Sequence, residues 1–469
     1  QWAQQHANMQ SYGAMTIPDI EGEITRELQG TLLGTAIKEK GLLALTPGVR
    51  GLEISEAITR YAKRHPERRS QIEVLVTAAA QNDDPAALQA VISIARGFKQ
   101  RTVKEKAGEL VEQIAERRGW STDELADRTI PTAGFLTAQE ARGAAGGAES
   151  NDAADAGGEA GAIEHGVAVL DFGARQFTMR IADDLTLALF NADGKQLKAL
   201  PSAGVKDDAD LAKAARATFT AAKKELTQVV ELQSARLQEA MSLDRTWSAG
   251  TWRDAFGDHP VMRHLVARLV WATGPGGPGT DAADVTLFAP TLDGEVLDAE
   301  DGEVELADDA PVWLAHASRL TAEQADTWTQ RFADYGITPL FVQLEATPVE
   351  LGVGQTQLID REGWVMTIGA LRTRATKLGY RFASAEDGGW IGSLIRDVGP
   401  WQIVLAFSGT YPGQDMSESA AVQRLSVQKG GRDVDLGTVP PVLLAVAYGD
   451  YLHVAAGGAY DPDWETAGM

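Results

Sequence analysis

Two neighbouring carboxylates, Glu386 and Asp387, come closest in this sequence to a pair of side chains that could do chemistry. Two flexible glycines and then Trp390 follow them. Close carboxyl groups can raise one another's pKa, and a carboxyl with a raised pKa can act as a general acid or base. The same string is typical of a turn between two strands, and we favour the turn. An enzyme of unassigned class that uses Glu386 and Asp387 stays an alternative hypothesis.

Such an enzyme would also need a cation to hold an anionic substrate. Arg175 lies just after the Asp171-Phe172-Gly173 turn, and Lys377 lies near the end of a helix predicted from Trp364 to Leu378. Arginine and lysine side chains bind carboxylates and phosphates through charge-assisted hydrogen bonds. Arg175 and Lys377 are therefore the anion-binding candidates.

The sequence predicts no metal site and no cofactor. The seven histidines are His6, His65, His165, His259, His264, His316 and His453. No two of them have the four-residue spacing and intervening Glu of a zinc hydrolase. His259 and His264 lie five apart, and we assign them a capping or packing role. The acidic residues 298–305 lack the residue order of a calcium loop, so we favour a solvated hairpin there.

Motifs for nucleophilic catalysis and phosphate binding are incomplete. The chain has no cysteine, which excludes thiolate catalysis, thiolate metal sites and disulfides. Ser408 lacks the glycine context of a nucleophile elbow. The glycine-rich stretch 274–279 lacks the lysine of a phosphate loop. Solvent-exposed loops are the favoured interpretation of both.

The charge of the chain makes nucleic acid a poor partner. Acidic residues outnumber basic ones by 66 to 43, and the net charge of -23 repels a phosphate backbone and an anionic leaflet. The dense basic strips are Lys63, Arg64, Arg68 and Arg69, and Arg96, Lys99, Arg101, Lys104 and Lys106. We favour solvated helix faces for both. A DNA-associated regulator is a second alternative, and it predicts a strongly salt-dependent affinity.

Several absences lead us to expect a cytoplasmic location. No apolar run approaches a membrane span, and the N-terminus lacks the basic-then-apolar order of a signal peptide. The lack of cysteine is compatible with a reducing compartment. Because the chain begins Gln1-Trp2 without an initiator Met, we expect it to be a piece of a longer protein.

The elements that must position these residues fall into an N-terminal helical part and a mixed C-terminal part. An acidic linker rich in Ala and Gly, residues 137–164, follows a helical-repeat segment, residues 1–136. Apolar residues three and four apart predict helices over 52–61, 72–80, 88–95 and 103–115, which resemble the HEAT class of repeats. Asp84, Thr102 and Ser121 are the expected N-terminal caps. Residues 1–45 remain unassigned, although Ile24 to Leu33 fits a helix.

After the linker, the sequence predicts an α+β domain over 165–345 and a C-terminal α+β unit over 346–469. A small meander of strands precedes a helix of roughly thirty residues, which we expect to cross the meander as a spine. Further predicted elements include helices over 252–256 and 261–271 and a strand over 303–306. The predicted fold class is α+β, with HEAT-like helices followed by strand-rich α/β units.

Aromatic residues are the other candidates for binding. The chain has 11 tryptophans, several next to Gly, Pro or charge, and such residues either close a core or anchor a protein interface. Core packing is favoured for each one singly. Trp120 and Trp390 are the binding candidates.

One string in the sequence resembles a known family. Residues 117–135, which read RRGWSTDELADRTIPTAGF, resemble a signature of the MolR-like proteins, large bacterial proteins whose shared C-terminal region is catalogued as a domain of unknown function. The likeness continues through LDFGARQF (170–177), NADGK (191–195), HPV (259–261), RLVW (268–271), ATKLGY (375–380), EDGGW (386–390), VPP (439–441) and DPDW (461–464). Together the strings cover most of residues 30–469.

The resemblance implies the C-terminal portion of a longer protein without an established reaction. Longer members look like helical-repeat proteins, some with a WGR domain, but this chain has no Trp-Gly-Arg string. Family members tend to accompany MoxR-type AAA+ ATPases and von Willebrand factor A proteins. We therefore expect a non-catalytic protein-interaction scaffold or adaptor, with a groove in the helical part and a second surface in the mixed part.

Overall fold

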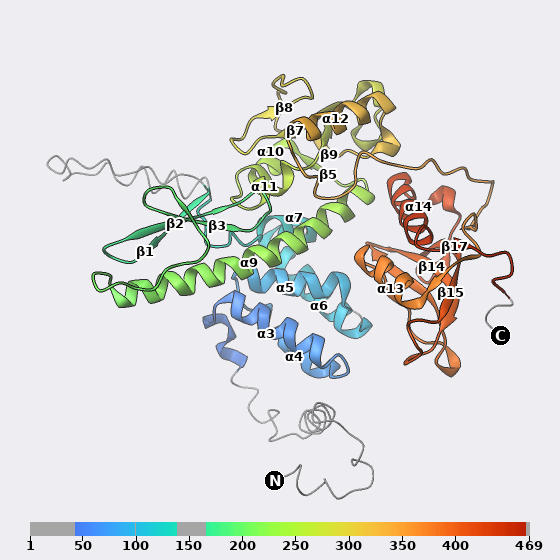
Figure 1. Ribbon diagram of the computed structural model, residues 1–469, viewed down its shortest axis with the longest axis horizontal. Coiled ribbons are helices and arrows are strands. Elements are labelled where there is room, and N and C mark those ends of the chain that lie inside the picture. The colour runs from blue at the N-terminus through green and yellow to red at the C-terminus, as the bar shows by residue number, and fades with distance from the viewer. Residues whose placement is uncertain (1–42, 99, 138–165, 466–469) are drawn as a thin grey trace, which may run out of the picture.

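The computed structural model describes residues 43–98, 100–137 and 166–465 (Figure 1). The predicted helix around Ile24 and most of the predicted linker lie outside these residues. The described chain forms a helical segment followed by strand-rich units, which confirms the α+β class.

The helical segment consists of two stacked helix pairs and one short helix. Its members are α3 (Gly51–Arg64), α4 (Arg69–Ala79), α5 (Pro85–Gly97), α6 (Arg101–Arg118) and α7 (Thr122–Arg128). The helix α3 packs on α5, and α4 packs on α6, so equivalent helices of successive pairs lie against each other. Such packing is that of a helical-repeat stack, because each helix buries its apolar stripe against the next pair. The four helices predicted from apolar spacing coincide with α3 to α6, and only the one predicted over 72–80 runs one residue past its helix.

Side chains hydrogen-bond to the starts of three of these helices. The Asp84 carboxylate accepts a hydrogen bond from the Ala86 N–H at 2.9 Å and another from the Gly51 N–H at 2.9 Å, so one side chain serves the starts of α5 and α3. Ser121 and Glu124 form a capping box at α7. The prediction for Thr102 is wrong, because α6 already begins at Arg101 and no side chain caps it.

The meander lies on one end of a long helix (Figure 1). In sheet order, its strands are β1 (Val167–Asp171), β2 (Gln176–Ile181), β3 (Leu187–Asn191) and β4 (Gln196–Leu197). The helix α9 (Ala209–Ser242) has 34 residues and is capped by Asp208. At 1.5 Å per residue it is about 50 Å long. It packs on β1 at one end and on the C-terminal helix α14 (Pro441–Ala455) at the other, so it is the predicted spine.

The next unit is a five-stranded sheet with helices around it. Its strands, in sheet order, are β5 (Thr246–Ser248), β9 (Pro311–Leu314), β6 (Trp271–Thr273), β7 (Thr286–Pro290) and β8 (Val296–Leu297). Its helices are α10 (Ala249–Trp252), a π-helix (Arg253–Gly257), α11 (Met262–Val266) and α12 (Ala322–Asp334). The helix predicted to reach Trp271 is too long, because Trp271 pairs with Phe288 in the sheet. Of the strand predicted over 303–306, only an isolated bridge at Glu303 forms.

The C-terminal unit is built on an eight-stranded antiparallel sheet. The strands are β10 (Gln357–Leu358), β11 (Trp364–Thr367), β12 (Arg381–Phe382), β13 (Ile391–Val398), β14 (Trp401–Thr410), β15 (Ser419–Lys429), β16 (Arg432–Asp433) and β17 (Ala459–Tyr460). The order is β12-β13-β14-β15-β11-β17, and β10 and β16 also pair with β15. The helix predicted from Trp364 is wrong in its first turn. Trp364 to Thr367 pair with β15, and α13 (Ile368–Lys377) begins only where Thr367 caps it.

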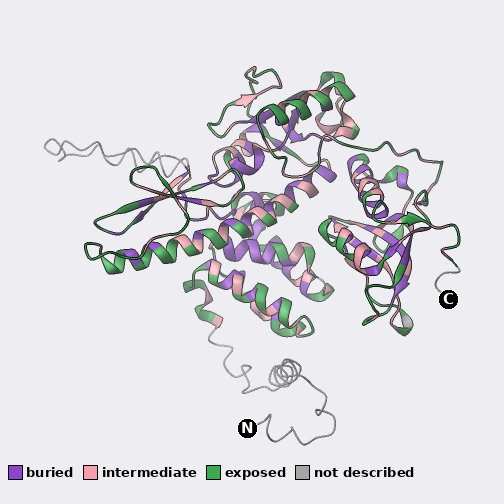
Figure 2. Ribbon diagram, viewed as in Figure 1, coloured by how far each residue is buried: buried purple, intermediate pink, exposed green. Residues whose placement is uncertain are grey.

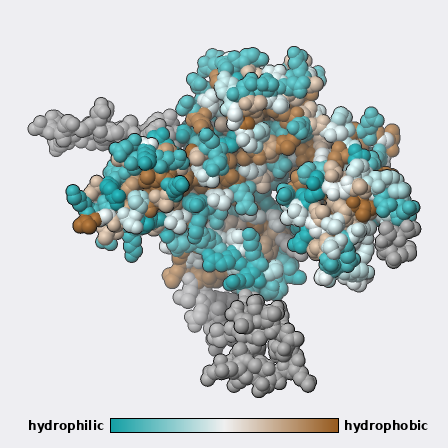
Figure 3. All heavy atoms as spheres, viewed as in Figure 1, coloured by the Kyte–Doolittle hydropathy of each residue, from teal (hydrophilic) through white to brown (hydrophobic). Residues whose placement is uncertain are grey.

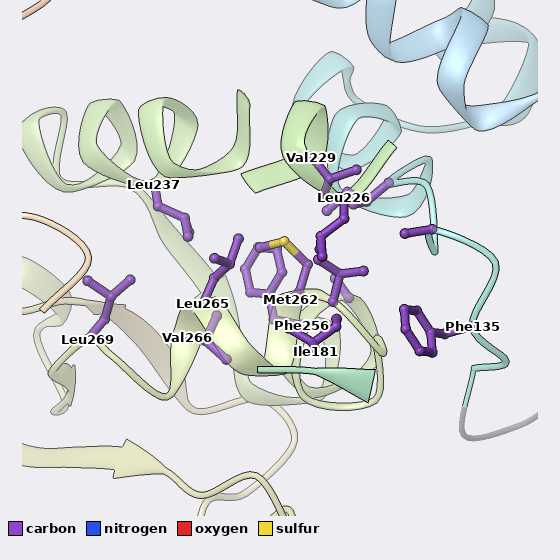
Figure 4. Close-up of a cluster of buried hydrophobic side chains, with 14 of the residues drawn as sticks. Phe135, Ile181, Leu226, Val229, Leu237, Phe256, Met262, Leu265, Val266 and Leu269 are labelled. Atoms are coloured by element: carbon purple, nitrogen blue, oxygen red, sulfur yellow. The ribbon is translucent and has the colours of Figure 1, made fainter. Parts of the chain in front are cut away.

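Buried side chains link α9 to α11 and to the core around them. In Figure 2 the buried residues concentrate along α5, α6 and the part of α9 beside them, and in the C-terminal sheet. In the close-up, Leu226 and Leu237 of α9 face Met262 and Leu265 of α11 (Figure 4). Each such side chain contributes about 1.5–3 kcal/mol to the free energy of folding when it is fully buried.

The helices of the described ranges are all too short or too polar to cross a membrane.

Aromatic packing fills the core beside α9. Trp252 stacks edge-on against Trp271 at 5.3 Å and against Phe288 at 5.6 Å, measured between ring centroids. Trp247 and Phe256 join the same cluster at 5.5 Å. These tryptophans are buried, as expected for each one singly.

Candidate interaction groove

The string 117–135 folds into the joint between the helical segment and α9. At its centre the Asp127 carboxylate accepts hydrogen bonds from Arg236 at 2.7 Å, from Arg245 at 2.5 Å and from the Trp247 indole N–H at 2.9 Å. Asp127 and Arg236 are both buried. Burial lowers the pKa of the Arg236 guanidinium, and the charge of Asp127 opposes that shift. The pair is fully hydrogen-bonded on the Asp127 side, which is what a buried charge requires.

A layer of amides extends this joint to α5. Arg236 donates to the Ala126 carbonyl at 2.9 Å and to the Gln233 side-chain oxygen at 2.6 Å. Gln233 in turn donates to the side-chain oxygen of Gln89 on α5 at 3.1 Å, and Gln89 donates to the Ala126 carbonyl at 2.9 Å. Helices α5, α7 and α9 are therefore held at one fixed spacing by connected polar groups.

The fixed spacing leaves an open groove with α3 and α9 as walls and α5 as floor. Its inner part has a volume of about 350 Å³. The lining residues are Ser55, Thr59 and Lys63 of α3, Ala86, Gln89, Ala90 and Ser93 of α5, Pro131, and Glu225, Gln228, Val229, Glu231, Leu232, Gln233 and Ala235 of α9. Small residues on α5 keep the floor low, and longer side chains on α9 form the higher wall.

The groove continues outward along the same two helices. A second hollow of about 350 Å³ is lined by Arg50, Leu52, Glu53 and Glu56 of α3 and by Arg216, Ala217, Thr220, Ala221 and Lys224 of α9. In this outer hollow the Lys224 ammonium of α9 contacts the Glu56 carboxylate of α3 at 3.1 Å, so one ion pair joins the two walls. From Arg216 to Ala235 the wall is about 28 Å long, at 1.5 Å per residue. We call both hollows together the α3–α9 groove.

One carboxyl in the groove wall has an unusual environment. Burial raises the pKa of Glu225 to about 7, and the negative charge of Asp84 acts in the same direction. A hydrogen bond from the backbone N–H of Ala133 lowers that pKa in part. Ala133 has a positive φ of 54° and precedes Gly134 at 79°, and this left-handed turn aims the N–H at Glu225. Glu225 therefore changes charge close to neutral pH.

The groove is suited to holding a polypeptide. Its walls carry charges of both signs, Lys63 against Glu231, and its floor is formed by Ala86 and Ala90. A groove between helices takes an amphipathic helix or an extended segment through such mixed walls. Within the described ranges, no group of three or more His, Asp or Glu side chains could hold a metal ion.

Arg175 and Lys377 line neither hollow of this groove and lie on different elements. Arg175 pairs with Asp207 at 2.5 Å and donates to the Ser202 carbonyl at 3.0 Å. Its guanidinium also lies 5.8 Å from the centroid of the Phe172 ring. It therefore holds the loop before α9 in place. Lys377 is exposed in the last turn of α13.

The two aromatic candidates are both half-buried. Trp120 lies between two guanidinium groups, with Arg118 at 5.5 Å and Arg128 at 5.4 Å from its ring centroid. Trp390 stacks edge-on against Tyr411 at 5.0 Å and lies directly on Gly409. A Cβ added at Gly409 would come within 1.8 Å of the Trp390 ring, so only glycine leaves room for it.

The carboxylate string forms a turn before β13. The Glu386 N–H donates to the Trp390 carbonyl at 2.7 Å, and the Gly389 N–H donates to the Glu386 carbonyl at 2.9 Å. The Glu386 side chain is exposed. The Asp387 backbone lies in this turn, while its side chain lies outside what the structure describes. No recorded hydrogen bond or ion pair joins Glu386 to Arg175, Lys377 or Trp120 in the described ranges.

One histidine and one residue of a basic strip have structural roles. His259 accepts hydrogen bonds from the N–H groups of Val261 and Met262 at the start of α11, in line with the expected capping or packing role. Arg96 is partly buried and pairs with Glu239 of α9, so the solvated-face interpretation does not hold for it.

Sequence reasoning missed the residues that shape the groove, namely Asp127, Arg236 and Glu225. A signal existed for Arg236. It lies on the apolar stripe of α9 between Val229 and Leu237, and a charge on such a stripe needs a buried partner. The partner could not be named from spacing, because Asp127 is 109 residues away in the sequence.

The middle of the chain is similar to a known protein family. Residues 194–380 match the family model described as "Domain of unknown function (DUF4132)". That range runs from the turn before β4 to the end of α13, so it contains α9 and the five-stranded sheet. It contains the α9 wall of the groove but not α3 or α5.

The chain is also distantly similar to the uncharacterized protein YehI of Escherichia coli (strain K12). The two are 29% identical over 350 residues, which are 74% of this chain and 26% of that protein. The chain thus spans about a quarter of the length of the relative. No solved structure matches the chain.

Proposed function

We propose that this chain is a non-catalytic protein-interaction scaffold or adaptor, and that its α3–α9 groove holds a helix or an extended segment of a partner protein. The observation that carries the proposal is the two hollows that follow about 28 Å of α9, a wall that the buried Asp127–Arg236 pair fixes in place. A segment of that length corresponds to about five helical turns.

Rigid walls favour such binding. Because Asp127, Arg236 and Gln233 already hold α9 against α5, a partner segment does not have to order the groove when it enters. A preformed site loses less conformational entropy on binding and so binds more tightly. The mixed charges of the walls select a partner with complementary charges.

The MolR-like resemblance supplies the proposed partners. We assign this chain to the C-terminal part of such a protein, acting in the cytoplasm with a MoxR-type AAA+ ATPase and a von Willebrand factor A protein. The match of residues 194–380 to a domain of unknown function supports this assignment, since the MolR-like proteins share such a region.

A groove-filling variant tests the proposal. Thr59 and Ser93 are exposed residues on the wall and the floor, so Thr59→Trp/Ser93→Trp narrows the groove from both sides. Glu112→Trp adds an indole on an exposed face of α6 and serves as the matched control. Binding to the purified MoxR-type ATPase and the purified von Willebrand factor A protein is measured by calorimetry. We expect the double variant to lose binding and the control to retain it.

The result that contradicts the proposal is equally specific. If the double variant melts like the parent chain and still binds with the same affinity, the groove is not the partner site. If the parent chain binds neither protein, a photo-reactive residue in place of Ser93 is used to capture a different partner. The proposal is wrong unless such a partner is captured and the groove-filling substitution at Thr59 abolishes its binding.

A further inference from the structure

A second hollow lies between the edge of the meander and the outer part of α9. It has a volume of about 420 Å³. It shares Arg216 and Thr220 with the outer hollow of the α3–α9 groove and no residue with the inner one. Its lining residues are Leu187, Leu189, Leu197, Lys198, Ala199, Leu200, Arg216, Phe219, Thr220 and Lys223. They come from β3, from β4 and the loop after it, and from one face of α9. We call this feature the meander hollow.

Apolar side chains form the base of the meander hollow. Leu187, Leu197, Leu200 and Phe219 are each only partly buried and pack against the main core. Figure 3 shows a mostly hydrophilic surface in which hydrophobic residues appear in small patches. Four partly exposed apolar residues therefore supply the apolar part of a hollow whose surface is otherwise mostly polar.

Cations form the rim of the same hollow. Lys198 and Lys223 are exposed, and no acidic side chain in the described ranges pairs with either. Arg216 is held in place, because its guanidinium donates to the Pro201 carbonyl and lies 6.0 Å from the Phe172 ring centroid. The hollow thus combines one fixed cation with two ammonium groups that are free to bind an anion.

The charge of this region is opposite to that of the whole chain. Residues 195–224 contain seven Lys or Arg against three Asp, while the whole chain has a net charge of -23. On α9, Arg216, Thr220 and Lys223 follow one another at helical spacing and so point to the same side. A basic site on an acidic protein attracts anionic groups locally and repels long polyanions through the field of the rest.

We propose that the meander hollow binds an acidic and apolar segment of a partner protein, with carboxylates on the lysines and leucine-like side chains on the leucine base. The chemistry favours a peptide over nucleic acid, because three cations around an apolar base make a poor path for a phosphate backbone. It also favours a peptide over an anionic membrane, which the net charge repels. The inference does not rest on the α3–α9 groove.

The probe for the test is a short synthetic peptide in which Glu alternates with Leu. Two further peptides replace Glu by Lys or Leu by Ser. Binding to the intact chain is followed by fluorescence anisotropy at low and at high salt. We expect the Glu-Leu peptide to bind, the other two to bind far more weakly, and the affinity to fall as salt rises.

Charge variants locate the site. Lys198→Glu/Lys223→Glu should weaken binding of the Glu-Leu peptide by at least about tenfold, since two attractive contacts become repulsive. Arg69→Glu/Arg432→Glu makes the same change in net charge on exposed residues elsewhere and should leave the affinity close to that of the parent. The milder Lys198→Gln/Lys223→Gln should give an intermediate loss.

Three results would overturn the inference. The first is that the Glu-Leu peptide does not bind, or that the peptide with Lys in place of Glu binds with the same affinity. The second is equal loss in the hollow variant and in its control, which would show a general charge effect. The third is that a single-stranded oligonucleotide, or vesicles of phosphatidylserine and phosphatidylcholine, bind more tightly than the peptide and depend on Lys198 and Lys223.

Discussion

The two ends of α9 use charged residues in opposite ways. At the inner end, Arg236 is buried and meets the buried carboxylate of Asp127. At the outer end, Lys223 is exposed beside the partly exposed ring of Phe219 and has no acidic partner in the described residues. Buried charges must be paired to be tolerated, whereas exposed ones cost little and stay available for ligands. We infer that the inner end fixes the architecture and the outer end recognises partners.

The strongest way to break this comparison is to remove the carboxylate at the inner end. Asp127→Ala leaves Arg236 buried without its partner, so we expect a loss of about 3–5 kcal/mol in the free energy of unfolding. Urea denaturation measures this loss. Asp123→Ala, on the exposed face of the same helix and only 3.8 Å from Arg245, should have a far smaller effect. Similar losses in both variants would mean that the joint is not specially stabilised.

Glu225, in the groove wall between the two ends, gives the next largest effect. Its pKa is about 7 in the folded chain, above the value of an unfolded glutamate. Below about pH 4.5 both states hold the proton, and as pH rises toward about 7 only the unfolded state releases it. Stability should therefore fall across this window by about 2–3 kcal/mol and then level off.

The measurement for Glu225 is urea denaturation at pH 5 and at pH 8 for the parent chain and for Glu225→Gln. The variant keeps the shape of the protonated side chain but cannot ionise. We expect it to lose less stability than the parent between the two pH values. Parallel losses in both proteins would show that Glu225 does not titrate differently in the folded state.

A partly buried ion pair should give an intermediate result. Arg96 of α5 pairs with Glu239 of α9, and both side chains are mostly covered. Arg96→Ala should cost about 1 kcal/mol, between the values for a buried and an exposed pair. Arg101→Ala breaks an exposed pair with Glu105 and is the control. A melting curve for each variant compares the two losses of stability. A larger drop in melting temperature for Arg101→Ala than for Arg96→Ala would contradict the prediction.

The smallest effect on stability is expected at the outer end. Lys198→Ala/Lys223→Ala removes two exposed cations that have no ion-pair partner among the described residues, so the melting temperature should not change. The same variant should bind the Glu-Leu peptide more weakly than the parent. A clear drop in melting temperature would show that these lysines support the fold and would remove the contrast between the two ends.

Much of the helical architecture could be predicted because its signals are local. Apolar residues three and four apart marked α3 to α6 and α9, and Ser121 marked the start of α7. The strand β11 was missed because the apolar run from Trp364 to Met366 fits a helix and a strand equally well. Its pairing with β15, more than fifty residues later, decides the outcome.

The candidate surfaces could be predicted only in part. The expectation of a groove in the helical part came from the repeat pattern, but one of its walls is α9, which lies well beyond the repeats in the sequence. Arg175 and Trp390 were chosen for their chemical types, and the structure shows Arg175 holding a loop through Asp207. A residue type gives the available chemistry, while its neighbours in space decide whether that chemistry is already used.

The sequence by itself determined the α+β class, the length of the spine helix and the excess of acidic charge. Each of these depends on composition or on residues a few positions apart. Tertiary structure alone decided that Asp127 would be buried under Arg236, that Glu225 would titrate near neutral pH, and that the lysines of the meander hollow would stay unpaired. The physical reason is that burial and electrostatic pairing depend on distances in space, which join residues more than a hundred positions apart.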